Sequence, residues 1–180
     1  LEGLLEQLQE QGLLPASGRQ RTDSTHILAA VRDLNRLERV GETLRAALNS
    51  VAVVAPDWLQ TLAPPVWYEH YGRRIENYHL PKTDAARQAL AAMIGADGQL
   101  LLEAIDAVDE HGWLGKVPAV QTLRRAWAEQ YIDVEGALVW RPVKDMPAPA
   151  ELLASPYDPD ARYSTKRSVE WVGHKVHFTE

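Results

Sequence analysis

Arg19-Gln-Arg-Thr-Asp-Ser-Thr-His-Ile27 is the stretch of sequence that decides the fold of this chain. It is polar, it contains the β-tolerant residues Thr22 and Thr25, and it follows a turn signal at Ala16-Ser-Gly18. Because it lacks a helical period, we expect residues 19–27 to form a strand. Asp23, at its centre, is a carboxylate that a strand can direct toward a metal ion instead of a core.

A long helix is predicted directly after this strand, from Ser24 or Thr25 onward. Apolar residues recur there at steps of three and four, and the charged residues Arg36, Arg39 and Glu42 lie mostly off that apolar stripe. The stripe comprises Ile27, Val31, Leu34, Leu37, Val40, Leu44 and Leu48. It indicates an ordinary helix packed on a core, with a dimer seam as the other interpretation.

Further helices are predicted through the middle of the chain. Pro56 begins one, and Thr83 caps another that runs to about Ile94, where Gly95 and Gly98 interrupt it. Two more are expected over residues 99–108 and 118–132, and residues 133–143 suggest a short hairpin. Four aromatic residues beside Arg73 and Arg74 indicate packing between helices, or else a surface that stacks bases: Trp67, Tyr68, Tyr71 and Tyr78.

The last ten residues carry the clearest strand pattern. Val172, His174, Val176 and Phe178 alternate with side chains expected on the opposite face, as in a strand. We expect this strand to lie beside the first one.

Length and composition indicate a globular chain of one domain or slightly more. The 180 residues contain no apolar run of membrane-spanning length, and the absence of Cys excludes disulfides and thiolate sites and fits a cytoplasmic protein. The net charge of −6 argues against a protein that coats nucleic acid, so any contact with DNA has to use local basic patches. The first residue is not Met and the last residues are strand-like, so we expect a fragment of a longer protein.

Other kinds of catalytic site find little support. His174 and His177 are three apart on a strand and face opposite sides, so they cannot chelate one ion together. No Gly-x-Ser-x-Gly elbow and no glycine-rich phosphate loop is present. Asp158 and Asp160 flank Pro159, which is first of all a turn signal.

Four segments together resemble a bacterial insertion-sequence transposase of the DDE type, over most of the chain. They are Arg21-Thr-Asp-Ser-Thr-His-Ile27, the helical block around Leu34-Asn-Arg-Leu-Glu38, Asp158-Pro-Asp-Ala-Arg162, and Trp171-Val-Gly-His-Lys-Val-His177. The strand around Asp23 and the pairing of the last two segments are the most specific parts. His174 stands where the resemblance leads us to expect a Tyr.

The resemblance implies an RNase H-like fold, a mixed sheet flanked by helices. Asp23 is then the first acidic residue of a catalytic triad and a magnesium ligand, and residues 172–180 form the next strand, antiparallel to the first. The implied reaction is metal-dependent cutting at transposon ends, followed by attack of the freed 3′-hydroxyl on target DNA. The second Asp and the Glu of the triad fall outside this chain, so the fragment alone is expected to be inactive.

The expected fold is therefore α+β and mostly helical, with a large all-helical insertion between the first strands of an RNase H-like sheet. Its expected segments are an N-terminal helix and turn (1–18), the first catalytic strand (19–27), the helical insertion and connector (28–155) and the continuing sheet (156–180). The implied partners are double-stranded DNA and further copies of the chain, with no membrane. Four basic residues are candidates for contacts with DNA phosphates: Arg21, Arg162, Lys166 and Lys175.

A second hypothesis belongs to a different functional class. In it, residues 27–132 form a helical protein-interaction or dimerisation module without catalysis. Asp23 is then a turn residue or the N-cap of the helix that follows it. Whether residues 20–25 pair with residues 172–179 distinguishes the two hypotheses.

Overall fold

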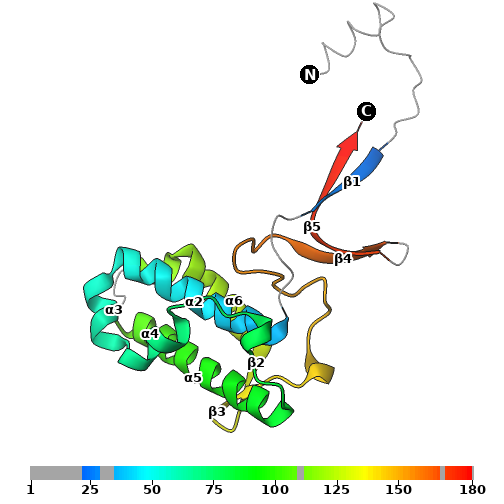
Figure 1. The fold of residues 1–180 in the computed structure, drawn as a ribbon. Coiled ribbons are helices and arrows are strands. Elements are labelled where there is room, and N and C mark those ends of the chain that lie inside the picture. The colour runs from blue at the N-terminus through cyan, green and yellow to red at the C-terminus, as the bar shows by residue number, and fades with distance from the viewer. Residues whose placement is uncertain (1–21, 29–34, 109–111, 167–168, 180) are drawn as a thin grey trace, which may run out of the picture. The chain divides into compact units, whose positions relative to one another are not determined.

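The computed structural model describes residues 22–28, 35–108, 112–166 and 169–179, and these form an α+β fold (Figure 1). The longest helices lie in the middle of the chain, and strands lie near both of its ends. In chain order, the helices of four or more residues and the strands are β1 (Thr22–Leu28), α2 (Arg36–Val54), α3 (Pro56–Leu62), α4 (Pro65–Tyr71), α5 (Asp84–Val108), α6 (Pro118–Gln130), β2 (Tyr131–Val134), β3 (Ala137–Trp140), β4 (Arg162–Lys166) and β5 (Val169–Thr179).

The predicted strands at the two ends belong to one three-stranded sheet, in the order β1-β5-β4. Strand β5 therefore lies between β1, from the beginning of the chain, and β4, which precedes it directly. β4 and β5 are antiparallel, with Arg162 opposite Gly173 and Lys166 opposite Val169. The expected pairing of the first strand with the last is confirmed. Within the described residues the sheet has β4 as its third strand, and an RNase H-like fold is not confirmed.

Contacts divide the chain into two compact units. The larger unit is Leu28–His174, and the smaller one includes residues 22–27 and 175–179. The boundary falls inside β5, so one continuous strand contributes to both units.

Helix α2 begins later than its apolar stripe predicts. Ser24 and Thr25 lie in strand β1, and α2 starts at Arg36. Asn35 is its N-cap: the Asn35 side chain accepts hydrogen bonds from the amides of Leu37 and Glu38, and the Glu38 side chain accepts one from the Asn35 amide. This capping box satisfies amides that a helix start leaves without partners, which fixes the start of α2 more firmly than the stripe does.

Helix α5 is continuous where an interruption is expected. Gly95 and Gly98 lie within its 25 residues. A Cβ on Gly98 would lie 2.0 Å from the Trp127 ring, and one on Gly95 would lie 2.5 Å from the Tyr131 ring. The two glycines thus allow α6 and β2 to pack closely on α5. Trp127 and Tyr131 also donate hydrogen bonds to the carbonyls of Gly95 and Ala91, at 3.0 Å and 2.8 Å.

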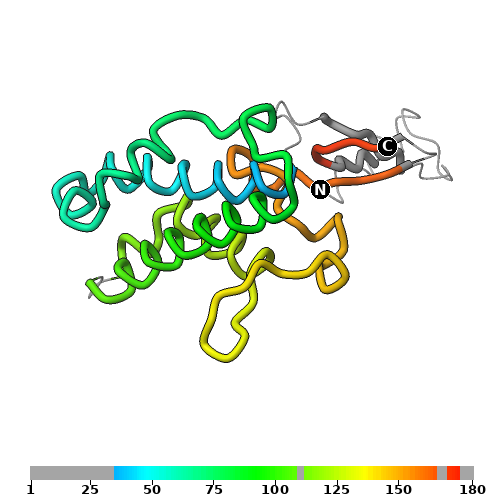
Figure 2. Tube along the Cα trace, turned by 60° about the horizontal axis from the view of Figure 1, so that its bottom comes forward, coloured from blue at the N-terminus to red at the C-terminus, as the bar shows by residue number. Residues whose placement is uncertain are grey.

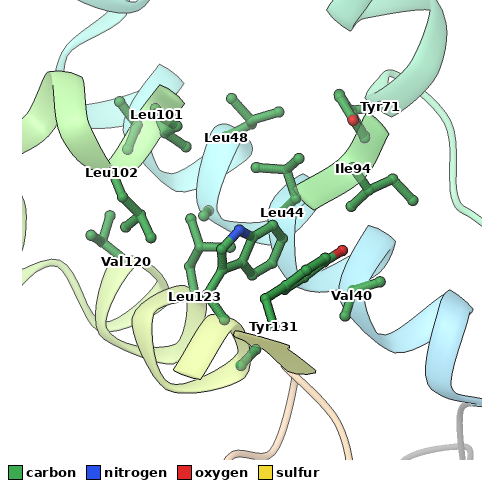
Figure 3. Packing of buried hydrophobic residues seen from close by; sticks show 14 of the residues in the cluster. Val40, Leu44, Leu48, Tyr71, Ile94, Leu101, Leu102, Val120, Leu123 and Tyr131 are labelled. Atoms are coloured by element: carbon green, nitrogen blue, oxygen red, sulfur yellow. The ribbon is translucent and has the colours of Figure 1, made fainter. Parts of the chain in front are cut away.

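The core of the larger unit lies between α2, α5 and α6, as Figure 3 shows from close by. Burial of this apolar cluster supplies the main stabilising term of the fold. Its fully buried members include Val40, Leu44, Val51, Ile94, Leu101, Ile105, Val120, Leu123 and Leu153. Val40 and Leu44 belong to the predicted stripe, and its members Leu37 and Leu48 are buried as well, so the core-facing interpretation of that stripe is confirmed from Leu37 onward. Val51 extends the buried face by one more residue.

The hairpin predicted over residues 133–143 is present as β2 and β3, drawn in yellow in Figure 2. Its turn residues Glu135 and Gly136 have φ values of 54° and 83°, as the right-handed twist of a two-residue hairpin requires. Asp133 supports the turn by accepting a hydrogen bond of 2.9 Å from the Gly136 amide. The central segment is therefore helical with one hairpin, and not all-helical as expected.

None of the helices in the described ranges combines the length and the apolar character needed to cross a bilayer.

Candidate functional site

Asp23, the expected catalytic carboxylate, lies in strand β1 next to β5 in the sheet. Lys175 lies in β5, in the same compact unit as Asp23. The fold thus places on neighbouring strands two predicted site residues that are separated by about 150 positions in sequence. Their side-chain positions lie outside the described part of the structure.

The other candidates for phosphate contacts are distributed differently. Arg162 and Lys166 stand at opposite ends of strand β4, about 13 Å apart for a rise of about 3.3 Å per residue. The Arg162 guanidinium donates hydrogen bonds to the carbonyls of Pro159 and Ala161, at 2.6 Å and 3.1 Å. Arg162 is therefore engaged within its own turn. Arg21 lies outside the described residues.

The Asp158-Pro-Asp160 segment forms a turn, as its sequence predicts, and contacts strand β5. Asp158 Oδ1 accepts a hydrogen bond from the Ala161 amide at 3.1 Å, and Asp158 Oδ2 lies 3.0 Å from His174 Nε2. The hydrogen bond with His174 lowers the pKa of the Asp158 carboxyl, although burial opposes this effect. Asp158 thus has a structural partner, and Asp160 is exposed.

The connector before this turn is fastened to helix α6 by an arginine and a glutamate. Arg125 donates hydrogen bonds to the carbonyls of Glu151 and Pro159 at 2.9 Å and 3.0 Å, and it pairs with Glu129 at 2.8 Å. Glu129 also accepts a hydrogen bond of 2.9 Å from the Leu153 amide. Of the basic pair Arg124/Arg125, Arg125 therefore has a structural role: its bonds fix the path of the chain into β4.

Two buried glutamates on α2 form a polar cluster that the sequence does not reveal. Glu38 and Glu42 are one helical turn apart and almost completely buried. Glu38 accepts a hydrogen bond of 2.5 Å from the Asn77 amide, and Glu42 accepts one of 2.6 Å from the Ile75 amide. These carboxylates hold the extended segment between α4 and α5 along α2. Glu42 lies off the predicted apolar stripe, so the stripe does not indicate that this side chain is buried.

The charge of Glu42 is compensated within the cluster. Arg45 donates hydrogen bonds of 2.9 Å and 3.1 Å to its two carboxylate oxygens, and the Tyr157 hydroxyl donates another. Burial by itself raises the pKa of Glu42, but the hydrogen bonds from Arg45, Tyr157 and the Ile75 amide outweigh it, so the pKa is lowered. Because its oxygens already accept these hydrogen bonds, the Glu42 carboxylate has a structural role.

The four aromatic residues expected to cluster near Arg73 and Arg74 differ in burial. Trp67 and Tyr71 are buried, and the Tyr71 hydroxyl donates a hydrogen bond of 2.6 Å to Asp97. Burial and this bond to Asp97 raise the pKa of Tyr71. Tyr68 and Tyr78 are exposed. The core-packing interpretation is confirmed for the first two residues and wrong for the last two.

The described part of the chain can be compared with what the expected magnesium site requires. Within the described ranges, no group of three or more His, Asp or Glu side chains is arranged to hold one. A single carboxylate at Asp23 does not satisfy a two-metal site, which takes carboxylates from several elements. The residues that the structure describes therefore do not by themselves make up the donor set that the implied magnesium ions require.

The position of Asp23 also bears on the interaction-module hypothesis. That hypothesis gives Asp23 the role of a turn or of the N-cap of the following helix, whereas Asp23 lies in a strand and Asn35 is the N-cap of α2. The strand pairing that the transposase hypothesis requires is present.

Comparison with known proteins identifies no matching family model, no significantly similar curated protein and no significantly similar solved structure. The family resemblance accordingly rests on the sequence motifs quoted above.

Proposed function

We propose that this chain is the first part of the catalytic domain of a DDE-type DNA transposase. Asp23 is the first of three metal-binding acidic residues in this proposal, and the second Asp and the Glu lie outside these 180 residues. The reaction is the cutting of transposon ends and the joining of the 3′-hydroxyl to target DNA. The full protein acts on double-stranded DNA as an oligomer.

One observation carries the proposal: β1 and β5 are neighbours in one sheet although the whole helical block separates them in sequence. The two most specific motifs of the resemblance, around Asp23 and around Lys175, occupy these two strands. A helical interaction module has no need for these distant segments to meet. The fold that the resemblance implies, in contrast, has the strand of the first catalytic Asp and the strand of residues 172–180 as neighbours.

The functional test uses the complete product of the gene. Supercoiled plasmid carrying the ends of the element is incubated with the protein and Mg²⁺, and nicked and joined products are quantified. Asp23→Asn should reduce both products at least about 100-fold, since the variant loses the charge that holds the metal ion. Asp57→Asn is the matched control, because Asp57 is an exposed aspartate in helix α3 and undergoes the same chemical change.

Three outcomes would contradict the proposal. One is undiminished activity of the Asp23→Asn protein. Another is nicking by the 180-residue chain alone that Asp23→Asn abolishes, since the proposal places two of the three acids elsewhere. A coding sequence that continues past Glu180 without an Asp at a strand end and a later Glu on a helix is the third, and it would favour the interaction module.

A further inference from the structure

Three arginines from separate elements line one pocket of the larger unit, which we call the arginine pocket. Arg36 is the first residue of α2, Arg87 lies in the first turn of α5, and Arg141 follows strand β3. The pocket has a volume of about 490 Å³. Sites that hold small molecules span about 300–1,000 Å³, so the pocket is large enough for such a ligand.

Two of the guanidinium groups are held in place at the end of helix α6. Arg36 Nε donates a hydrogen bond of 2.6 Å to Gln130 Oε1, and Arg36 Nη2 donates to the carbonyls of Gln130 and Arg141 at 3.1 Å and 2.7 Å. Arg141 donates from Nε and Nη2 to three carbonyls around the same helix end, at 2.8 Å, 2.8 Å and 3.2 Å. Nη1 of each arginine has no partner in the described part of the chain and is not buried, so it can donate to a ligand.

Arg87 is the least constrained of the three arginines. Its Nη1 donates one long hydrogen bond of 3.3 Å to the Pro81 carbonyl. Its Nε and Nη2 have no partner among the described residues and are not buried. The carbonyls at the end of α6 explain why two arginines stand there, but Arg87 makes no contact with them and has no comparable structural role.

The protein does not neutralise the charge of the pocket. Within the described ranges, none of the three arginines forms an ion pair with a carboxylate. Asp84, which is exposed, is the one acidic residue among those that line the pocket, so the lining has three positive charges and one negative charge. A helix C-terminus supplies only about half a negative charge. The balance of the lining therefore remains positive.

The pKa of Arg36 reflects this environment. Burial is the main cause that lowers its pKa to about 10, and the neighbouring positive charges of Arg141 and Arg39 contribute to the shift. A partly buried charge without a counter-ion is unfavourable, and a bound anion supplies the missing counter-charge.

We propose that the arginine pocket binds a phosphate monoester. Such a group carries a charge of about −2 at pH 7 and matches the balance of the lining better than a singly charged carboxylate or phosphodiester. Guanidinium groups also match phosphate oxygens in geometry. Leu37 and Trp140 supply an apolar wall for the organic part of the ligand. Phosphate monoesters occur on small molecules and at the 5′ ends of nucleic-acid strands, and the test separates these two sources.

The test is isothermal titration calorimetry of the 180-residue chain with phenyl phosphate at pH 7.5 and constant ionic strength. Saturable binding is expected, and methyl phenyl phosphate, the singly charged diester with the same ring, should bind about fivefold more weakly or worse. An oligonucleotide with a 5′-phosphate is then compared with the same strand without it. Tighter binding of the phosphorylated strand assigns the pocket to strand ends, and equal binding of the two strands assigns it to small molecules.

Two variants that change opposite charges test the pocket itself. Arg87→Gln should weaken the binding of phenyl phosphate about fivefold or more, because it removes a charged donor. Asp84→Asn should strengthen the binding about twofold, because it removes the opposing charge. Arg73→Gln is the matched control: Arg73 is exposed and lies outside the lining of this pocket, so the affinity should change less than about twofold. Asp84→Asn keeps the test decisive if the loss of Arg87 unfolds the protein.

Several results would overturn the assignment. They are the absence of saturable binding of phenyl phosphate, equal affinity for the monoester and the diester, undiminished binding by Arg87→Gln, weaker binding by Asp84→Asn, and an equal loss in Arg73→Gln. The assay contains no divalent metal and leaves Asp23 intact, so its failure is separate from failure of the catalytic proposal.

Discussion

Glu42 stands three residues before Arg45 on α2, a spacing that usually describes an exposed ion pair worth a few tenths of a kcal/mol. Here the carboxylate is fully buried and binds Arg45, Tyr157 and the Ile75 amide at the same time. Its environment depends on residues 33 and 115 positions away. Sequence spacing indicates only the local partner, so it does not predict the cluster.

Removal of this carboxylate should be costly. Glu42→Ala leaves the partly buried guanidinium of Arg45 and the Ile75 amide without their acceptor, so we expect a loss of about 3 kcal/mol in the free energy of unfolding. Urea denaturation followed by circular dichroism measures it. Glu103→Ala, an exposed glutamate on α5, should stay within about 0.5 kcal/mol of the native protein. A similar loss in both variants would contradict the structural role of Glu42.

The same carboxylate predicts a dependence of stability on pH. Its pKa is lower in the folded chain than in the unfolded chain, so its contribution is complete above the ordinary glutamate pKa of about 4.3 and is lost as the pH falls through the folded value. Melting temperatures measured from pH 7 to pH 3 should therefore decline more steeply for the native protein than for Glu42→Gln, which has no proton to take up. Parallel curves would refute the assignment.

Helices and strands that depend on local sequence patterns can be predicted from the sequence. The predictions are wrong where packing against residues distant in sequence overrides the local pattern. Strands β1 and β5, the hairpin and the starts of α3 and α6 follow from alternation, turn residues and proline. Thr83 lies at the start of α5 as predicted, with its hydroxyl 3.4 Å from the Ala86 amide. Gly95 and Gly98 indicated a break because their role, close packing of Tyr131 and Trp127, is invisible in a local window.

The hairpin turn offers a way to stabilise an element. Glu135 has a positive φ, which costs an ordinary L-residue roughly 1 kcal/mol and which Asn tolerates better. Glu135→Asn should raise the free energy of unfolding by about 0.5–1 kcal/mol in chemical denaturation. The matched variant Glu135→Gln removes the same charge without easing the backbone, and it should give no gain. An equal gain in both would show that charge, and not turn geometry, is responsible.

At the scale of the whole molecule, the fold class and the meeting of the chain's two end strands were predictable, but the complete site was not. The approach of β1 to β5 follows from the motifs of the resemblance, whereas the side chains around Asp23 and the remaining acids depend on residues beyond those described. A net charge of −6 means that contact with DNA has to be local.

This charge balance gives a prediction for duplex binding. If Arg21, Arg162, Lys166 and Lys175 each neutralise one phosphate, the slope of log affinity against log salt should be about −3.6, and Lys175→Ala should make it shallower by about 0.9. Titrations at four salt concentrations measure both values. Arg162→Ala should have a smaller effect on the slope than Lys175→Ala, since its guanidinium is occupied by turn carbonyls. Slopes that do not change when each of the four residues is replaced by Ala would remove these residues from the interface.

The passage of β5 through both compact units has a consequence for how the protein opens. Its residues before 174 belong to the larger unit, with its extensive core, and those after 174 belong to the smaller one. Native-state hydrogen exchange should therefore divide the amides of a single strand into two classes. Those of residues 175–179 should exchange through a low-energy partial unfolding that releases β1, and those of residues 169–173 should exchange only when the larger unit unfolds. Strand β5 would then be a boundary between cooperative folding units with no linker to mark it.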